Sequence, residues 1–192
     1  MEAILVPLRR LLSDWEQSRV TDAINKFTCE KDPDIEFFLK ERAIDFERIS
    51  KSRTYLLCER EEFSKGRLAI LGYFTLSLKS LALSKDLSVR QRKELDGFRG
   101  KLHGEPVQII SCYLIGQLAK NSAKSAALCG ADILNAAVSL SNMAATITGG
   151  RWVLVECHDK PQLINFYNNN SFQRIETDQH GDMCQMIRRV GA

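Results

Sequence analysis

The chain has 192 residues, of which 44% are hydrophobic and 27% charged, and its formal net charge is +3 at pH 7. This length and composition are typical of one soluble globular domain that buries a full core without metals or crosslinks, and they exclude a repeat or low-complexity protein. The weakly positive charge tolerates an anionic ligand but does not require a nucleic acid.

The six cysteines never stand closer than 17 positions apart, and no Cys-x-x-Cys pair occurs, so we expect no metal site. Several of them lie in apolar runs, where a free cysteine packs as a small hydrophobic residue, and we therefore expect a reducing, cytoplasmic environment. No run of 18 apolar residues is present, and the apolar run after Met1 is too short for a signal peptide. We expect no contact with a membrane.

Near the N-terminus, residues 5–15 give a weak indication of secondary structure and residues 32–49 a clear one. Leu5–Trp15 predicts only a short amphipathic or irregular lead-in. Asp32 followed by Pro33 is typical of a helix start, because aspartate caps the first turn and proline suits the first helical position. Apolar residues then recur three or four positions apart over residues 35–49, which predicts one helix with a face packed on a sheet.

The next segments predict an antiparallel strand pair and then an irregular insertion. Thr54–Cys58 and Arg67–Leu78 have the composition of strands, and the charged turn Glu59–Gly66 joins them. Residues 79–106 are the least sheet-like part of the chain, and we interpret them as a surface excursion. Within this excursion, Ser88 is suited to cap a short helix.

The central segment predicts a strand that leads through a polar loop into a long helix. The strand spans Val107–Ala119 and the loop Lys120–Ser125; the helix is expected to begin near Ala126–Gly130 and to end at Gly149. Its predicted buried face contains Ile133, Ala137, Leu140, Ala144 and Ile147. The backbone N–H groups and the positive dipole end at the start of such a helix form a site for phosphate.

The C-terminal part predicts a strand at Trp152–Glu156, a helix opened by Pro161, and a final strand pair around a turn at His180. The strands of this pair are Phe172–Ile175 and Met183–Arg189. The order of elements predicts an α/β (α+β) fold with a mixed, partly antiparallel central sheet and flanking helices. It is not the strict alternation of a doubly wound fold.

Three motifs in this order resemble the GNAT superfamily of acyl-CoA-dependent N-acetyltransferases. Leu71–Leu76 is similar to the third strand of the family and Ile115–Ala119 to the fourth. Ile164–Tyr167, with Phe172 five positions after the tyrosine, is similar to the Tyr-x-x-x-Gly-Phe end of the domain. The resemblance covers nearly the whole chain and implies a single GNAT-like domain (1–192), in which a splayed strand pair receives acetyl-CoA.

Gly116 interrupts an otherwise bulky strand, where glycine often marks a bulge or a close backbone approach. In the resemblance, such a bulge splays this strand from Trp152–Glu156. Backbone groups are then free for pantetheine and for the thioester oxygen. The alternative is a glycine that only admits a neighbouring side chain.

The loop departs from the family pattern Gln/Arg-x-x-Gly-x-Gly/Ala, in which small residues let backbone N–H groups wrap the pyrophosphate. Gly130 matches this pattern, but Leu128 stands where glycine is expected, and leucine resists a positive φ. The hydroxyls of Ser122 and Ser125 and the charge of Lys124 offer partial compensation. The alternative is a solvated polar loop. The cofactor-binding residues that the resemblance implies are Gly116, Gln117, Leu118, Ala119, Ser122, Lys124, Ser125, Ala126, Gly130 and Asn165.

Tyr167 is the candidate catalytic residue, because it matches the general acid of the family and a positioned phenol can supply the proton that a departing thiolate needs. The alternative is that Phe166 and Tyr167 are core residues of a short helix. Asn165 is suited either to orient the cofactor or to cap that helix, and Ser171 replaces the glycine of the family motif. No general base is identified, and Glu156 is interpreted as a surface or structural carboxylate.

The leading hypothesis from the sequence is transfer of an acetyl group from acetyl-CoA to a primary amine of a small molecule or peptide, by direct attack in a ternary complex. Residues 27–29, 37–39 and 72–76 look most like the branch of toxin-like acetyltransferases that modify aminoacyl-tRNA. In that reading the phosphate contacts are Arg90, Arg92, Lys93, Arg99 and Lys101. The alternative for these cations is a solvated helix face.

A second class of function is a non-catalytic module that binds CoA or a partner protein, which the degenerate glycine pattern favours. An edge strand near the C-terminus could pair two copies of the chain in a homodimer. Neither reading requires a metal.

Overall fold

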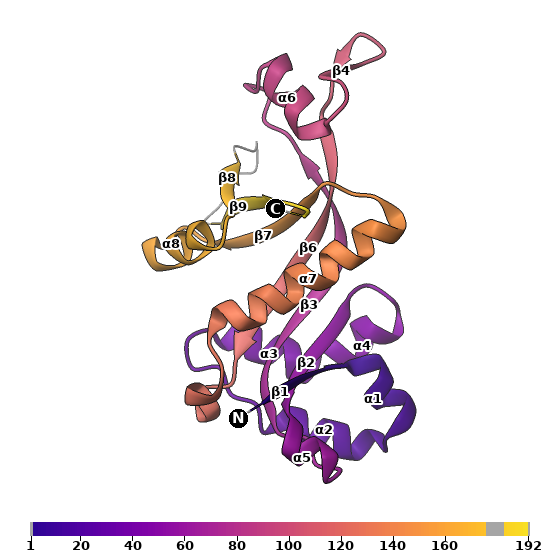
Figure 1. Cartoon of the computed structure of the whole chain (residues 1–192), viewed down its shortest axis with the longest axis vertical. Helices are drawn as coiled ribbons and strands as arrows, with labels where there is room; N and C mark the ends of the chain where they lie inside the picture. Colours follow the sequence, from indigo (N-terminus) through magenta and orange to yellow (C-terminus); the bar gives the residue numbers. More distant parts are fainter. Residues whose placement is uncertain (1, 176–182, 192) are drawn as a thin grey trace. The chain divides into compact units, whose positions relative to one another are not determined.

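The computed structural model describes residues 2–175 and 183–191 (Figure 1). Among these residues, seven strands form a mixed sheet in the order β1-β2-β3-β6-β7-β9-β8, and β4 and β5 form a separate hairpin. The strands are β1 (Ala3–Pro7), β2 (Arg53–Glu59), β3 (Ile70–Ala82), β4 (Lys101–Leu102), β5 (Glu105–Pro106), β6 (Ile109–Lys120), β7 (Trp152–His158), β8 (Gln173–Ile175) and β9 (Met183–Arg189). The helices are α1 (Leu8–Asp14), α2 (Gln17–Asn25), α3 (Pro33–Glu41), α4 (Ala43–Arg48), α5 (Arg60–Ser64), α6 (Val89–Asp96), the 3-10 helix η1 (Ser122–Ala127), α7 (Gly130–Thr148) and α8 (Pro161–Asn169).

The chain divides into two compact units. One comprises Met1–Ser77 and Ile115–Ser139, and the other comprises Leu78–Leu114 and Leu140–Ala192. Strands β3 and β6 and helix α7 each contribute residues to both units. The two units are described separately below.

The first unit is built on strands β1, β2 and β3, which pair antiparallel, with Leu5 opposite Leu57 and Leu56 opposite Tyr73. The predicted pairing of the second and third strands is therefore confirmed. The rings of Phe27 and Tyr73 meet edge to face in its core, with centroids 5.4 Å apart. The buried residues of this core are Val6, Leu8, Leu11, Val20, Ala23, Ile24, Phe27, Cys29, Leu39, Ala43, Leu56, Cys58, Ile70, Tyr73 and Ala119.

Of the two readings of the lead-in over residues 5–15, the irregular one is wrong, and helix α1 fits the amphipathic one. Ala3–Pro7 is strand β1, because its backbone pairs with β2 along its whole length. Leu8 and Leu11 of α1 are buried in the core. The pairing partner of β1 lies far away in the chain, so the local pattern does not reveal the strand.

The predicted helix after Asp32 begins as expected but is divided. The side chain of Asp32 caps the helix, and Pro33 is its first residue. At Arg42 (φ −125°, ψ −30°) the helix separates into α3 and α4. The bend allows Leu39 and Ala43, on either side of it, to pack into the same core. The prediction of one continuous helix is therefore wrong.

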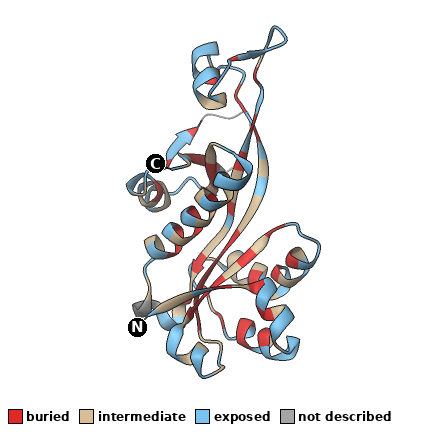
Figure 2. Ribbon diagram, turned by 45° about the vertical axis from the view of Figure 1, so that its right-hand side comes forward, coloured by how far each residue is buried: buried red, intermediate tan, exposed pale blue. Residues whose placement is uncertain are grey.

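Helix α7 buries a shorter stripe than predicted. Its buried residues are Ile133, Leu134, Ala137, Val138 and Ser141. In Figure 2 the ribbon of α7 alternates between buried and exposed residues. Residues 142–148 contain no buried residue, so Ile147, which was expected on the buried face, is 84% exposed. Gly149 (φ 74°) follows the last turn, which confirms the predicted helix end.

In the second unit, β9 pairs antiparallel with both β7 and β8, which confirms the predicted final strand pair. The predicted turn at His180 lies outside the described residues. The buried residues of this unit's apolar cluster are Leu81, Leu83, Val107, Ile110, Cys112, Leu154, Ile175 and Ile187.

Helix α6 lies in the predicted excursion and contacts β7 of the same unit. Ser88 and Gln91 form a capping box at its start, which confirms the predicted cap. The indole N–H of Trp152 on β7 donates to the carbonyl of Leu95 at 2.7 Å. Leu95 and Trp152 also pack against the apolar cluster of this unit.

Candidate functional site

The candidate cofactor strand is the second half of β6, in the first unit. Gly116 is exposed, and Gln117 and Leu118 are half-buried. Ala119 is buried in the apolar core. The cofactor role of these four residues stays a prediction.

The loop after β6 is anchored by Asn121, a residue that sequence reasoning missed. Its side chain is buried; Nδ2 donates to the carbonyl of Ile70 at 2.9 Å. Its Oδ1 accepts from the hydroxyl of Thr28 at 3.2 Å and from the N–H of Ala123 at 3.1 Å. The amide therefore ties the start of η1 to β3 and to the segment before α3. The one local signal is an asparagine directly after a strand, a residue type that often caps a turn.

The 3-10 helix η1 and the start of α7 take the place of the expected glycine-rich turn. Ser125 and Ala126 lie in η1, and Gly130 is the first residue of α7. Leu128 has φ −154° and ψ 142°, an extended conformation that any residue adopts. The positive φ that leucine resists is therefore not needed at this position.

A carboxylate caps the start of α7. Asp132 Oδ2 accepts from the backbone N–H of Cys129 at 2.9 Å, the arrangement of a helix capping box. Hydrogen bonds from the side chain and the backbone of Cys129 lower the pKa of Asp132. Its negative charge is therefore present at neutral pH, and it occupies an N–H group that a phosphate would use at a helix N-terminus.

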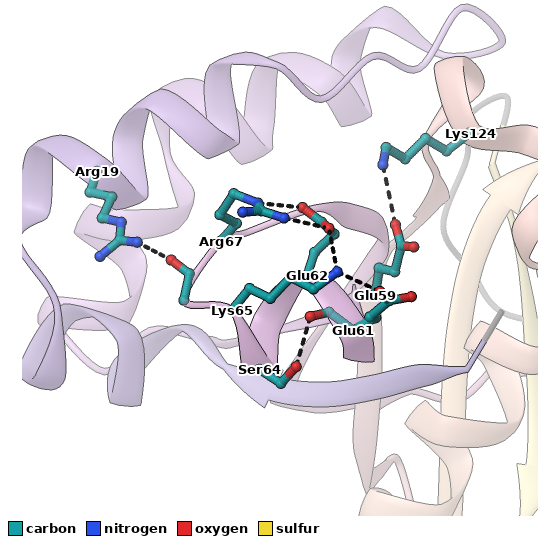
Figure 3. Close-up of polar contacts among 9 residues, drawn as sticks. Arg19, Glu59, Glu61, Glu62, Ser64, Lys65, Arg67 and Lys124 are labelled. Carbon is teal, nitrogen blue, oxygen red and sulfur yellow. Dashed lines mark hydrogen bonds and ion pairs between the residues drawn. The ribbon is translucent and has the colours of Figure 1, made fainter.

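The loop side chains that could meet phosphate already have protein partners. Ser122 Oγ accepts from the backbone N–H of Glu30 at 3.0 Å, a bond that does not use its own proton. Lys124 Nζ lies 3.5 Å from Glu59 Oε2 (Figure 3). A hollow of about 760 Å³ beside Glu59 is lined by Glu2, Glu59, Arg60, Glu61 and Ser64.

Figure 3 shows how the carboxylates near this hollow are paired. Arg67 forms two bonds with Glu62, at 2.6 and 2.8 Å, and these bonds lower the pKa of Glu62. Glu59 instead faces Lys124. A phosphate held by Lys124 would have to displace this partly exposed ion pair, and such pairs are weak in water.

The donors in this segment fit the phosphates of acetyl-CoA. They are the hydroxyl of Ser122, the ammonium of Lys124 and the backbone N–H groups at the start of α7. Asp132 opposes an anion at the same helix end. The donors therefore suit a pyrophosphate in chemical type, and the carboxylate of Asp132 does not.

The end of α8, in the second unit, is a complete Schellman motif. The N–H of Phe172 donates to the carbonyl of Tyr167, and the N–H of Ser171 donates to that of Asn168, both at 3.0 Å. Ser171 has φ 65°, the left-handed conformation that glycine adopts most easily. The rings of Tyr167 and Phe172 supply the apolar contact of the motif, with centroids 5.6 Å apart. The Tyr-x-x-x-Gly-Phe pattern is therefore a helix C-cap, with Ser171 in the glycine position.

Tyr167 is buried in an aromatic cluster with Phe166 and Phe172. Burial, and then the neighbouring thiols of Cys157 and Cys184, raise the pKa of Tyr167. The phenol is therefore protonated throughout the neutral range, as a general acid must be, while its raised pKa makes it a weaker proton donor than a free tyrosine. Aromatic packing and proton donation are compatible at this position.

The two thiols beside Tyr167 stand directly opposite each other on β7 and β9. The Sγ atoms of Cys157 and Cys184 are 3.4 Å apart. Burial raises the pKa of Cys157. The buried cysteines are Cys29, Cys58, Cys112, Cys157 and Cys184, which confirms their predicted packing as small apolar residues, whereas Cys129 is exposed.

Two other candidate residues have structural surroundings. Asn165 is exposed in the middle of α8, whose N-cap is Lys160, so it does not cap the helix. Glu156 forms an ion pair with Lys79 at 2.6 Å and accepts from Gln185 Nε2 at 2.7 Å. These bonds agree with the interpretation of Glu156 as a structural carboxylate.

The prediction that Arg92 contacts phosphate is wrong. Arg92 is 4% exposed. Its guanidinium donates to the carbonyls of Ser84 at 2.6 Å, Leu87 at 3.0 Å and Val107 at 2.5 Å. The guanidinium of Arg92 therefore joins the two ends of the excursion through these hydrogen bonds. The other cations of the predicted set, all exposed, are Arg90, Lys93, Arg99 and Lys101.

Within residues 2–175 and 183–191, no helix is long and apolar enough to span a membrane. In the same residues, no group of three or more histidine, cysteine, aspartate and glutamate side chains could hold a metal ion.

The fold is the GNAT-like acetyltransferase fold, as the sequence predicts. It is shared with the toxins AtaT and KacT. AtaT complexed with acetyl-methionyl-tRNAfMet matches 98% of this chain and 95% of its own, with a TM-score of 0.71 and 16% sequence identity. A tyrosine-to-phenylalanine mutant of KacT matches 99% of this chain and 96% of its own, with a TM-score of 0.72 and 17% identity.

A mutant of AtaT bound to acetyl-CoA and to the C-terminus of the antitoxin AtaR matches 99% of this chain and 94% of its own, with a TM-score of 0.66 and 16% identity. No protein-family model and no curated protein sequence matches the chain. The predicted GNAT-like fold is therefore confirmed.

Proposed function

We propose that this protein transfers the acetyl group of acetyl-CoA to the amine of an aminoacyl-tRNA. The observation that carries the proposal is the match along 98% of the chain to AtaT, in a structure complexed with acetyl-methionyl-tRNAfMet. This acceptor replaces the small-molecule or peptide amine that the sequence favours. The exposed cations on and after α6 are compatible with an RNA acceptor.

Tyr167 is the proposed general acid. In the transfer, a bond forms between the amine nitrogen and the thioester carbonyl carbon, the carbon–sulfur bond breaks, and the leaving sulfur takes up a proton. Because burial raises the pKa of Tyr167, its hydroxyl holds that proton at neutral pH. The amine gives up its own proton to water. The related toxin structures include tyrosine-to-phenylalanine mutants of AtaT and KacT, the substitution that removes a phenolic hydroxyl.

Acetyl-CoA supplies the activated acyl group when it is bound. We propose that the backbone at Gly116, Gln117, Leu118 and Ala119 receives the pantetheine. The residues proposed to hold the phosphates are Ser122, Lys124, Ser125, Ala126 and Gly130, and Asn165 is proposed to contact the cofactor from α8.

Asp132 and the pair between Lys124 and Glu59 favour a second candidate, a non-catalytic module that binds CoA or a partner protein. Both features place negative charge beside the donors that would hold phosphate. A module that no longer needs tight cofactor binding would tolerate them.

The two candidates are separated by calorimetry with acetyl-CoA and by a transfer assay. The assay uses acetyl-CoA labelled in the acetyl group and offers aminoacyl-tRNA, deacylated tRNA and the free amino acid in turn. We expect label on aminoacyl-tRNA alone. Label on the free amino acid would restore the small-amine reading, and binding without transfer to any acceptor would favour the module. No heat of binding at millimolar acetyl-CoA would overturn both cofactor-dependent readings.

A further inference from the structure

The turn after α6 presents an aromatic ring to solvent on a rigid backbone. Phe98 is 79% exposed. Asp96 Oδ2 accepts from the N–H of Phe98 at 3.3 Å and from the N–H of Arg99 at 2.9 Å. Gly97 ends the helix with φ 87°, and its N–H donates to the carbonyl of Lys93 at 2.8 Å. The turn is therefore fixed by hydrogen bonds on both sides of the exposed ring.

Two glycines in this turn pack closely against α6 and against Arg151 of the same unit. A Cβ atom on Gly100 would lie 2.2 Å from the carbonyl oxygen of Val89, so the backbone there is packed tightly against α6. The carbonyl of Gly100 accepts from the N–H of Val107 at 2.9 Å. A Cβ atom on Gly97 would lie 2.2 Å from the guanidinium carbon of Arg151. A flexible loop could fold its aromatic ring onto the protein surface. The backbone of this turn is fixed, and it keeps the Phe98 ring exposed.

Two exposed cations, Arg99 and Lys101, follow the ring in the chain. The carboxylates on either side are Asp96, which is half-buried and accepts from the N–H groups of Phe98 and Arg99, and Glu105. The guanidinium of Arg99 lies 5.8 Å from the centroid of the Phe98 ring. An exposed aromatic ring flanked by cations is the combination that stacks on an unpaired base and contacts its phosphates.

Phe37 provides the contrasting case in the first unit. Its ring is 53% exposed and also lies near an arginine, with Arg42 at 5.9 Å from the centroid. Its surroundings are acidic, however. The hollow beside it is lined by Cys29, Glu30, Pro33, Glu36, Phe37, Lys40 and Glu41. Three carboxylates thus line the hollow beside Phe37, whereas the Phe98 turn has two exposed cations and one half-buried carboxylate.

We propose that the Phe98 turn (residues 96–101) is an RNA-contacting surface, in which Phe98 stacks on an unpaired base while Arg99 and Lys101 contact phosphates. The proposal extends the aminoacyl-tRNA acceptor proposed above to a specific surface. In Figure 1, α6 and β4 project beyond the strands β7 and β9 of the same unit.

The test measures binding of deacylated tRNA and of a short single-stranded RNA by fluorescence anisotropy. We expect Phe98→Ala to weaken binding of both RNAs roughly 5- to 100-fold, because stacking on one base has about that effect. Phe98→Trp retains the binding of the natural chain, and Phe37→Ala leaves it unchanged. Since Phe98 is exposed, a thermal melt should show that each variant folds. Equal effects of the Phe98 and Phe37 substitutions, or none from either, would overturn the proposal.

A salt series tests the phosphate contacts separately. Replacing Arg99 and Lys101 by glutamine should reduce the slope of log affinity against log salt by roughly 1.4, at about 0.7 for each lost contact with single-stranded RNA. An unchanged slope contradicts the proposal. Binding to vesicles rich in anionic lipid that falls with Phe98→Ala, while RNA affinity holds, would assign the surface to a membrane instead.

The outcome can be read independently of the proposed enzyme activity. Calorimetry with acetyl-CoA should give the same affinity for Phe98→Ala and for the natural chain. If acetyl-CoA does not bind and RNA still binds through Phe98, the acetyltransferase proposal fails and the RNA surface stands. If acetyl transfer occurs but Phe98→Ala binds RNA as tightly as the natural chain, the acetyltransferase proposal stands and the RNA-surface proposal fails.

Discussion

The loop after β6 and the end of α8 are held in place by different means. The loop lacks most of the small residues of the family pattern, and the buried side chain of Asn121 holds it through partners that are distant in sequence. The end of α8 is held by its own local hydrogen bonds and by the contact of Tyr167 with Phe172. Local bonds can therefore keep a left-handed residue in place without a glycine, as Ser171 shows.

The largest effect is expected at Tyr167. Tyr167→Phe should lower the rate of acetyl transfer roughly 10²- to 10⁴-fold, because the leaving sulfur loses its proton donor. The affinity for acetyl-CoA should not change, since the ring and its packing remain. Steady-state kinetics and calorimetry on the same preparation measure both quantities.

Tyr73→Phe is the matched control. The hydroxyl of this second buried tyrosine donates to the carbonyl of Ile35, and burial raises its pKa as well. Its loss should lower the free energy of unfolding by about 1–2 kcal/mol and leave the transfer rate unchanged. Equal losses of rate in the two variants would remove the catalytic role of Tyr167.

The anchoring of the loop is tested by Asn121→Ala. The substitution leaves the carbonyl of Ile70 and the N–H of Ala123 without their side-chain partner, so we expect the free energy of unfolding to fall by about 2–4 kcal/mol. Urea denaturation measures the change. Asn165→Ala, on an exposed face of α8, should stay within about 0.5 kcal/mol of the natural chain. If both variants are equally stable, the amide does not hold the loop.

A smaller effect is expected for the charge at the start of α7. Asp132→Asn keeps an acceptor for the N–H of Cys129 but removes the negative charge, so acetyl-CoA should bind roughly two- to five-fold more tightly. Calorimetry measures the affinity, with Asp86→Asn in the second unit as the control for a general change in charge. Unchanged or weaker binding in the Asp132 variant would mean that the phosphates do not approach this helix end.

The smallest effect is expected at Ser171. Ser171→Gly relieves the left-handed strain but makes the unfolded chain more flexible, so we expect a net gain of about 0.5 kcal/mol in stability. Ser139→Gly, the same change inside α7, should instead cost about 0.5–1 kcal/mol. A loss at Ser171 as large as that at Ser139 would show that the φ angle stores no strain.

The sequence predicts those features whose signals are local. The cap at Asp32, the capping residue Ser88 and the helix end at Gly149 are all confirmed, because each conformation is set by residues within one turn. The final strands are also predicted to within one residue of their bounds, Gln173–Ile175 and Met183–Arg189.

The features that were missed depend on contacts between distant segments. Strand β1 forms through pairing with β2. Arg92 is buried because the carbonyls of Ser84 and Val107 accept hydrogen bonds from its guanidinium. Asn121 was overlooked because its partners, Thr28 and Ile70, are far away in the chain. Leu128 was misjudged because the family pattern assumes a turn that η1 replaces.

The most direct test of the proposed function is the chemical identity of the product. The protein is incubated with acetyl-CoA and aminoacyl-tRNA, the RNA is digested with nuclease, and the terminal aminoacyl-adenosine is analysed by mass spectrometry. The account predicts aminoacyl-adenosine heavier by one acetyl group, on the amine, with far less of it from Tyr167→Phe. Unmodified aminoacyl-adenosine, from a protein that binds both acetyl-CoA and tRNA, would contradict it.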